Sequence, residues 1–166
     1  MQKSLSELTF EKEIIKSLDD NGWHYRPDLS HSTEEKLLSN WREVLNRQNV
    51  ERLKDTPLTD EEFEQIKSQV FAINSPLEAA RFLSTGQVII SREINGQKSD
   101  LILECFWSHD VAGGKNSYEV VNQITRKKNR ATGQDHRFDV TLLISGIPVI
   151  HLELKREGVS IEQAYW

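Results

Sequence analysis

Cysteine and long hydrophobic runs are what this 166-residue sequence has least of. Its single cysteine, Cys105, excludes an internal disulfide, and with five scattered histidines it forms no C-x-x-C zinc motif. No apolar run approaches the roughly 18 residues that span a membrane, and residues 1–10 hold no apolar block typical of a signal peptide. We therefore expect a cytoplasmic protein that has neither a structural zinc nor a membrane partner.

The sequence also lacks an excess of basic residues. It contains 21 Lys and Arg residues and 26 Asp and Glu residues, so the net charge is −5. That balance argues against a protein that coats nucleic acid by bulk attraction. The charge is uneven, however, since residues 115–137 hold six basic and two acidic residues. The candidate phosphate contacts there are Arg126, Lys127, Lys128, Arg130 and Arg137. The basic run at 126–130 equally suits a solvated loop, and both interpretations stay open.

The length favours a single domain over residues 1–166, because domains most often contain about 100–150 residues. Large apolar anchors are present, with 4 Trp, 3 Tyr and 6 Phe, so the composition is not that of a disordered chain. The pattern predicts mainly helices in residues 1–86 and mainly strands in residues 87–157.

Four helices are predicted in the first part from apolar residues that recur with a period near 3.6. Three of the four starts carry Ser or Thr with Glu three residues later, which is the capping-box pattern. The helices are expected to begin near Thr9 and just after Ser32, Thr59 and Ser75. The first should end before Gly22 and the last at Gly86, because glycine favours a helix end.

Strands are predicted after Gly86 from segments rich in Val, Ile and Leu. They cover residues 87–94, 99–107, 118–125, 138–144 and 149–155. Asn95-Gly96 tolerates positive φ at both central positions of a type I′ turn and joins the first two strands into a hairpin. We expect an α+β fold in which helices flank a mixed sheet of about five strands.

A last helix start is predicted at residues 160–163, SIEQ, but only three residues follow it. So short a helix gains little stability by itself. We therefore expect a C-terminally truncated fragment of a longer subunit, in which residues 160–166 begin a helix.

The last hairpin places three ionisable residues in an unusual arrangement. Side chains alternate along a strand, so Glu153 and Lys155 share a face. If the turn is centred on Gly146, residues whose numbers add to 292 lie opposite each other, and Asp139 faces Glu153. This needs a loop of odd length, because a strict two-residue turn at Ser145-Gly146 shifts the register by one.

Two neighbouring carboxylates with a lysine suit Mg²⁺, which binds through one or two carboxylates, water and substrate phosphate. Such a metal polarises a phosphodiester and lowers the pKa of a bound water. The alternative is a solvent-facing strand with cross-strand ion pairs. The pattern E-x-K alone decides little, because it also occurs at Glu34-Glu35-Lys36, on a predicted helix.

A longer pattern surrounds these residues. Residues 137–155 read RFDVTLLISGIPVIHLELK, and residues 156–164 continue with REGVSIEQA. This run resembles the nuclease motifs of the restriction (motor) subunit of type I restriction-modification enzymes, in which R-[FY]-D-V-T precedes E-L-K-x-x-G-V and a helix. Residues 10–18 and Gly22-Trp23 are similar to the opening helix of that family.

The resemblance implies a PD-(D/E)xK restriction-endonuclease-like core with catalytic Asp139, Glu153 and Lys155, and with Mg²⁺ held by the two carboxylates. It also implies that Glu11 is the carboxylate which such folds often bring from their first helix. Glu11 lies on the inward stripe by its spacing to Ile14, Ile15 and Leu18. The alternative is a first-turn acid favoured by the helix dipole.

Two departures from the family pattern are visible. Phe138 stands where the name PD-(D/E)xK has proline, as is usual in this family. A Q-x-x-x-Y element that the family carries on its last helix falls past Trp166. We therefore expect the isolated fragment to be weak or inactive as a nuclease.

By this resemblance the leading function is Mg²⁺-dependent endonucleolytic cleavage of double-stranded DNA by a type I site-specific deoxyribonuclease. Its implied partners are the DNA and the modification and specificity subunits of the complex. ATP serves only the motor domain, which lies outside this chain. Two alternatives are kept: a non-catalytic docking module of the same subunit, and a PD-(D/E)xK nuclease of the repair or junction-resolving type.

Overall fold

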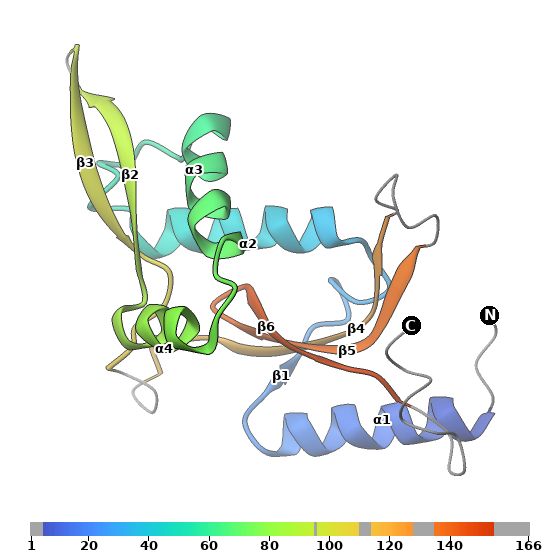
Figure 1. Ribbon diagram of the computed structural model, residues 1–166. Coiled ribbons are helices and arrows are strands. Elements are labelled where there is room, and N and C mark those ends of the chain that lie inside the picture. Colours follow the sequence, from blue (N-terminus) through green and yellow to red (C-terminus); the bar gives the residue numbers. More distant parts are fainter. Residues whose placement is uncertain (1–4, 95, 110–113, 128–134, 155–166) are drawn as a thin grey trace. The chain divides into compact units, whose positions relative to one another are not determined.

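The computed structural model describes residues 5–94, 96–109, 114–127 and 135–154. The chain is a mixed α/β protein, in agreement with the predicted fold class (Figure 1). Its elements in order are α1 (Leu5–Asp20), β1 (His24–Tyr25), α2 (Glu34–Gln48), α3 (Asp60–Phe71), α4 (Pro76–Thr85), β2 (Gln87–Ile94), β3 (Gln97–Glu104), β4 (Tyr118–Arg126), β5 (His136–Ile144) and β6 (Ile147–Leu152).

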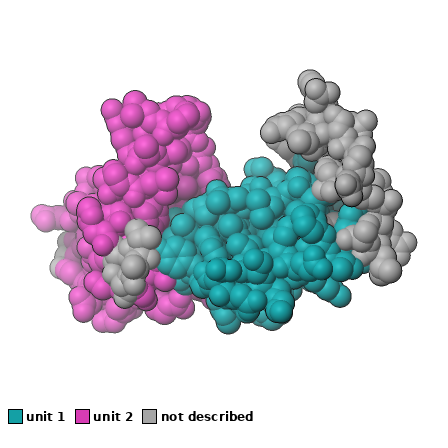
Figure 2. All heavy atoms as spheres, turned by 90° about the horizontal axis from the view of Figure 1, so that it is seen from below, with its two compact units in different colours: residues 1–38, 117–166 teal, residues 39–116 magenta. Residues whose placement is uncertain are grey.

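The chain divides into two compact units (Figure 2). Unit 1 combines residues 1–38 with residues 117–166, and unit 2 is the intervening segment 39–116. None of the helices in the part of the chain that the structure describes has the length and apolar character needed to cross a membrane.

Unit 1 is built on a four-stranded sheet with the order β1-β4-β5-β6, in which only the β1–β4 pair is parallel. Helix α1 packs along one face of this sheet, where Ile15 joins Val120, Val140 and Leu142 in one hydrophobic cluster (Figure 1). A second cluster contains Leu29, Leu37, Val121, Ile124 and Leu143. Because Val120 and Val121 are consecutive residues of a strand, the two clusters lie on opposite faces of the sheet.

The strands are divided differently from the predicted sheet of about five. Strands β2 and β3 pair with each other from Gln87↔Glu104 to Ile94↔Gln97 and form a separate two-stranded sheet. Their two-residue connection at 95–96 agrees with the predicted hairpin, and Gly96 has φ of 78°. The parallel strand β1 was not predicted, because two residues are too few to show a period.

Unit 2 confirms the predicted helix caps. Thr59 accepts a hydrogen bond from the backbone N–H of Glu62, whose carboxylate accepts one from the backbone N–H of Thr59. Gly86 ends α4 with φ of 66°, and a Cβ at that position would lie 2.2 Å from the carbonyl oxygen of Phe106. Only glycine fits there, for its conformation and for its size.

A buried ion pair joins α3 to β2 within unit 2. The carboxylate of Glu62 accepts hydrogen bonds of 2.6 Å from Nε and from Nη2 of Arg92. The remaining donor capacity of Arg92 is used by the carbonyl groups of Leu53, Thr56 and Pro57. The hydrogen bonds from Arg92 lower the pKa of Glu62 below its ordinary value.

We predict that Glu62→Gln destabilises the protein by about 3 kcal/mol at neutral pH, because it leaves a buried guanidinium without its carboxylate. The pKa of Glu62 is lowered on folding, so this contribution is fully present above about pH 4.5 and is lost as the pH falls through the folded-state value. Thermal unfolding measured from pH 3 to pH 7 should therefore show that the difference in stability between wild type and variant becomes smaller as the pH falls. Asp60→Asn, at an exposed first-turn acid, is the control that should change little. A difference independent of pH would contradict the prediction.

Candidate active site

The ladder of the β5–β6 hairpin runs up to the residues next to Asp139 and Glu153. Val140↔Leu152 and Thr141↔His151 are paired, and their numbers add to 292 as predicted. Near the turn the pairs are Leu143↔Pro148 and Ile144↔Ile147, which are offset by one residue from that register. Strand β6 ends at Leu152, and the same register continued by one position would set Asp139 opposite Glu153.

The turn itself differs from the predicted loop of odd length. Ser145 and Gly146 form a two-residue connection and both have positive φ, 48° and 82°, as a type I′ turn requires. A register shift at Leu142/Leu143 leaves Val149 as the extra residue of a β-bulge in β6. The bulge adds back the residue that the tight turn removes, so the register is right although its predicted cause is wrong.

Asp139 is buried, with 5% of its surface exposed, whereas Glu153 is exposed. The Oδ2 atom of Asp139 accepts a hydrogen bond of 2.7 Å from the backbone N–H of Leu154. Asp139 is thus held against the chain segment that carries Glu153. Lys155 lies outside the described residues.

Glu11 is buried on α1, with 3% of its surface exposed, as its place on the inward stripe predicted. Its Oε1 and Oε2 atoms accept hydrogen bonds of 2.6 Å each, one from the side-chain amide of Asn122 and one from that of Gln123. The alternative of a first-turn acid does not hold, because α1 begins at Leu5 and its first-turn acid is Glu7.

Strand β4 lies between Glu11 and the hairpin. The pairs Asn122↔Val140 and Ile124↔Phe138 bracket Gln123, so Gln123 stands at the register position of Asp139. Glu11 therefore reaches β4 at the level of Asp139. Among the described residues, however, no three carboxylate, histidine or cysteine side chains come close enough to form a metal cluster.

The donor chemistry of Asp139 and Glu153 nevertheless fits Mg²⁺. This ion needs only one or two protein carboxylates, because water and substrate phosphate complete its octahedral shell. Asp139 lies on β5 and Glu153 directly follows β6, and each offers carboxylate oxygens rather than the nitrogen or sulfur ligands that favour zinc.

A groove of about 700 Å³ opens beside Glu11 in unit 1. Its lining is rich in charged and polar groups: Glu11, Lys12, Lys16, Asp19, Tyr25, His31, Asn122, Gln123 and Arg137. Sequence reasoning found Glu11 and Arg137 in this set and missed the others. Lys12 and Lys16 could have been found from the sequence, because they lie on the same predicted helix as Glu11. No sequence pattern indicated Asn122 or Gln123.

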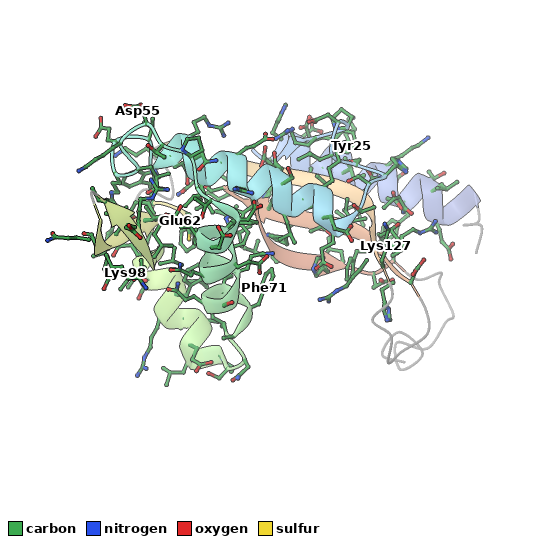
Figure 3. The ribbon with its side chains drawn as sticks, turned by 90° about the horizontal axis from the view of Figure 1, so that it is seen from above. Tyr25, Asp55, Glu62, Phe71, Lys98 and Lys127 are labelled. Atoms are coloured by element: carbon green, nitrogen blue, oxygen red, sulfur yellow. The ribbon has the colours of Figure 1, made fainter. Side chains whose placement is uncertain are left out.

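Three of the five predicted DNA-binding residues are described, and they lie where β4 ends and β5 begins. Arg126 ends β4 and its Nε atom lies 3.1 Å from a carboxylate oxygen of Glu34, in a solvent-exposed ion pair. Lys127 follows directly after β4 (Figure 3). Arg137 lies on β5 and lines the groove beside Glu11. Lys128 and Arg130 lie outside the described residues.

The amino-acid sequence that forms these units matches a known family. The family model described as type I restriction enzyme R protein N terminus covers residues 4–166. This chain belongs to that family, which confirms the resemblance seen in residues 137–164.

Individual proteins similar to this chain are also named as subunits of type I restriction enzymes. The chain is 29% identical over 160 residues to the type I restriction enzyme SsaAORF53P endonuclease subunit of Staphylococcus saprophyticus and to the SauCOLORF180P endonuclease subunit of Staphylococcus aureus. It is 29% identical over 164 residues to the EcoprrI endonuclease subunit of Escherichia coli. Each match covers 96% of this chain, but only 16% of either staphylococcal protein and 47% of the third.

Proposed function

We propose that this chain is the nuclease domain of a type I restriction enzyme R subunit and that it cleaves double-stranded DNA with Mg²⁺ in the cytoplasm. The observation that carries the proposal is the bulge-corrected hairpin, whose ladder ends at Val140↔Leu152, so that Asp139 and Glu153 are the next residues on its two segments. Lys155 follows Glu153 by two residues and completes the PD-(D/E)xK pattern. Membership of the family and the names of its relatives support the same conclusion.

Each residue of the proposed site has its own role in phosphodiester hydrolysis. Asp139 and Glu153 would hold Mg²⁺, and the Leu154 N–H keeps the Asp139 carboxylate oriented toward the 153–154 segment. When bound, Mg²⁺ supplies charge for the phosphodiester and lowers the pKa of a water ligand. Lys155 orients the attacking water or balances the negative charge that develops on the phosphate. Glu11 would contribute a separate carboxylate from α1, on the groove side of β4 and not as a member of a three-carboxylate cluster.

DNA would be held mainly through its phosphates. Arg137 with Lys12 and Lys16 gives the groove a basic lining near Glu11, whereas Arg126, paired with Glu34, and Lys127 lie outside that lining at the end of β4. Lys128 and Arg130 would continue this basic segment. Such contacts are indifferent to base sequence, so recognition of a site falls to the specificity subunit.

The rest of the subunit would supply what this chain lacks. The chain spans only 16% of the staphylococcal relatives, and we assign the ATP-driven motor to the remainder. The modification and specificity subunits are the proposed partners. The docking-module alternative predicts that the three site residues are dispensable for cleavage, whereas the nuclease proposal predicts that each is required. Membership of this family argues against a repair or junction-resolving nuclease.

We expect the isolated 166-residue chain to unfold cooperatively but to cleave plasmid DNA at a rate near background in Mg²⁺. With a net charge of −5, its DNA affinity rests on few basic residues. Each neutralised phosphate contributes about −0.9 to the slope of log affinity against log salt concentration. The five residues predicted from the sequence therefore give at most about −4.5, and Lys12 and Lys16 bring the limit to about −6.3. An agarose-gel cleavage assay should show activity only when the chain is part of a complete R subunit in its complex. Rapid cutting of plain duplex by the isolated chain would disprove the need for the remainder.

A further inference from the structure

Two consecutive residues of β4 donate hydrogen bonds to the same carboxylate. The side chains of Asn122 and Gln123 bind the two different oxygens of Glu11, each at 2.6 Å. In a regular strand, consecutive side chains point to opposite faces of the sheet. This strand must therefore be irregular at one of the two residues.

The irregularity is at Gln123, whose φ is 57°. Few residues other than glycine adopt this left-handed conformation, and a β-strand is an unfavourable place for it. Its effect is visible in the core, where Val121 and Ile124 belong to the same hydrophobic cluster. Residues three apart in a regular strand would face opposite ways, so the strand reverses its faces at Gln123 while its ladder with β5 resumes at Ile124↔Phe138.

The amide of Asn122 is itself oriented by a second strand. The hydroxyl of Tyr25 on β1 donates to the Oδ1 atom of Asn122 at 3.1 Å, which turns the Nδ2 group toward Glu11. Asn122 and Gln123 are both buried. A conformation that local energetics disfavours is therefore maintained by surrounding structure, and its result is a Glu11 carboxylate with a defined direction at the wall of the groove.

We infer that Asn122 and Gln123 are positioning residues of the nuclease site, which orient the Glu11 carboxylate toward the metal and substrate. This inference rests on the proposed function and adds two residues that the PD-(D/E)xK pattern does not contain. The Asn122 and Gln123 amides act through Glu11 and need not touch DNA. The competing explanation is a structural tie that merely fastens α1 to β4.

Gln123→Gly separates these explanations. Glycine accepts a positive φ without strain, so the variant keeps the backbone conformation of β4 while it removes the side chain that donates to Glu11. We expect its thermal stability to be retained, while its affinity for Mn²⁺, measured by calorimetry on the 166-residue chain, falls about tenfold to a hundredfold. Lys54→Gly is the matched control, because Lys54 has φ of 52°, is exposed and belongs to unit 2. It should leave Mn²⁺ affinity unchanged.

A double-mutant cycle with Glu11→Gln gives the second readout. If Gln123 acts through Glu11, the double variant should bind Mn²⁺ no more weakly than Glu11→Gln alone. Additive losses, or a Gln123→Gly variant with wild-type affinity, would overturn the positioning role while leaving the nuclease proposal intact. If wild type binds no Mn²⁺ at all, the proposed metal site fails and this inference fails with it.

Discussion

Asp139→Asn is expected to abolish detectable Mn²⁺ binding by this chain and DNA cleavage by the complete R subunit. Substitution of residues that only support a metal ligand costs about tenfold to a hundredfold, so loss of a direct ligand should exceed a hundredfold. Asparagine keeps an oxygen that can accept the hydrogen bond from the Leu154 N–H, so the hairpin should remain folded. Calorimetry with Mn²⁺ and a plasmid cleavage assay measure the two losses.

The matched control is Glu119→Gln. Glu119 is a buried carboxylate on the neighbouring strand, where it is paired with Arg26 and lies opposite Leu143 in the ladder. Its substitution removes a negative charge from the same sheet at a distance of four ladder positions from Asp139. Mn²⁺ affinity should persist in this control. Unchanged metal binding in Asp139→Asn would show that the site assignment is wrong.

Lys155→Ala should reduce DNA cleavage by the complete R subunit by about 10²–10⁴-fold while ATP hydrolysis and translocation continue. The reason is that this lysine serves phosphodiester hydrolysis and lies apart from the proposed motor. Cleavage assays and ATPase assays on the same preparation give the required comparison.

The sequence offers its own control for this experiment. Lys36 also follows a glutamate by two residues, but it lies in the first turn of α2, where its Nζ atom donates to the carbonyl oxygen of Asp28 at 2.5 Å. The complete R subunit with Lys36→Ala should cleave DNA at the wild-type rate. A parallel fall of ATPase and cleavage in Lys155→Ala would instead make Lys155 a structural or coupling residue.

The helices and the hairpins were predictable because their signals are local. A capping box such as Thr59 with Glu62, or a glycine at the end of a helix such as Gly86, acts within a few residues of the chain. The register of the last hairpin was also predicted, although the bulge at Val149 that produces it was not. The candidate site followed from the pattern around Asp139, Glu153 and Lys155, and the role of each remains a prediction.

Features that depend on distant partners were not predictable. Strand β1 exists because two residues find a parallel partner in β4, about 95 residues later in the chain. The conformation of Gln123 is equally invisible, since nothing in the local sequence favours a positive φ there. Both result from tertiary structure overriding local preference. The separation of β2 and β3 from the larger sheet belongs to the same class.

Unit 1 is assembled from two segments of chain that the whole of unit 2 separates. On the ribosome, α1 is complete long before Val120, Val140 and Leu142, against which Ile15 packs, have been synthesised. At about 5–20 residues per second, the roughly 105 residues between Ile15 and Val120 take on the order of 5–20 s to appear. Unit 2 is continuous and can fold during this delay, whereas α1 must wait with its apolar side uncovered. Nascent chains stalled before residue 117 should therefore bind chaperones through α1, and those stalled after β5 should release them.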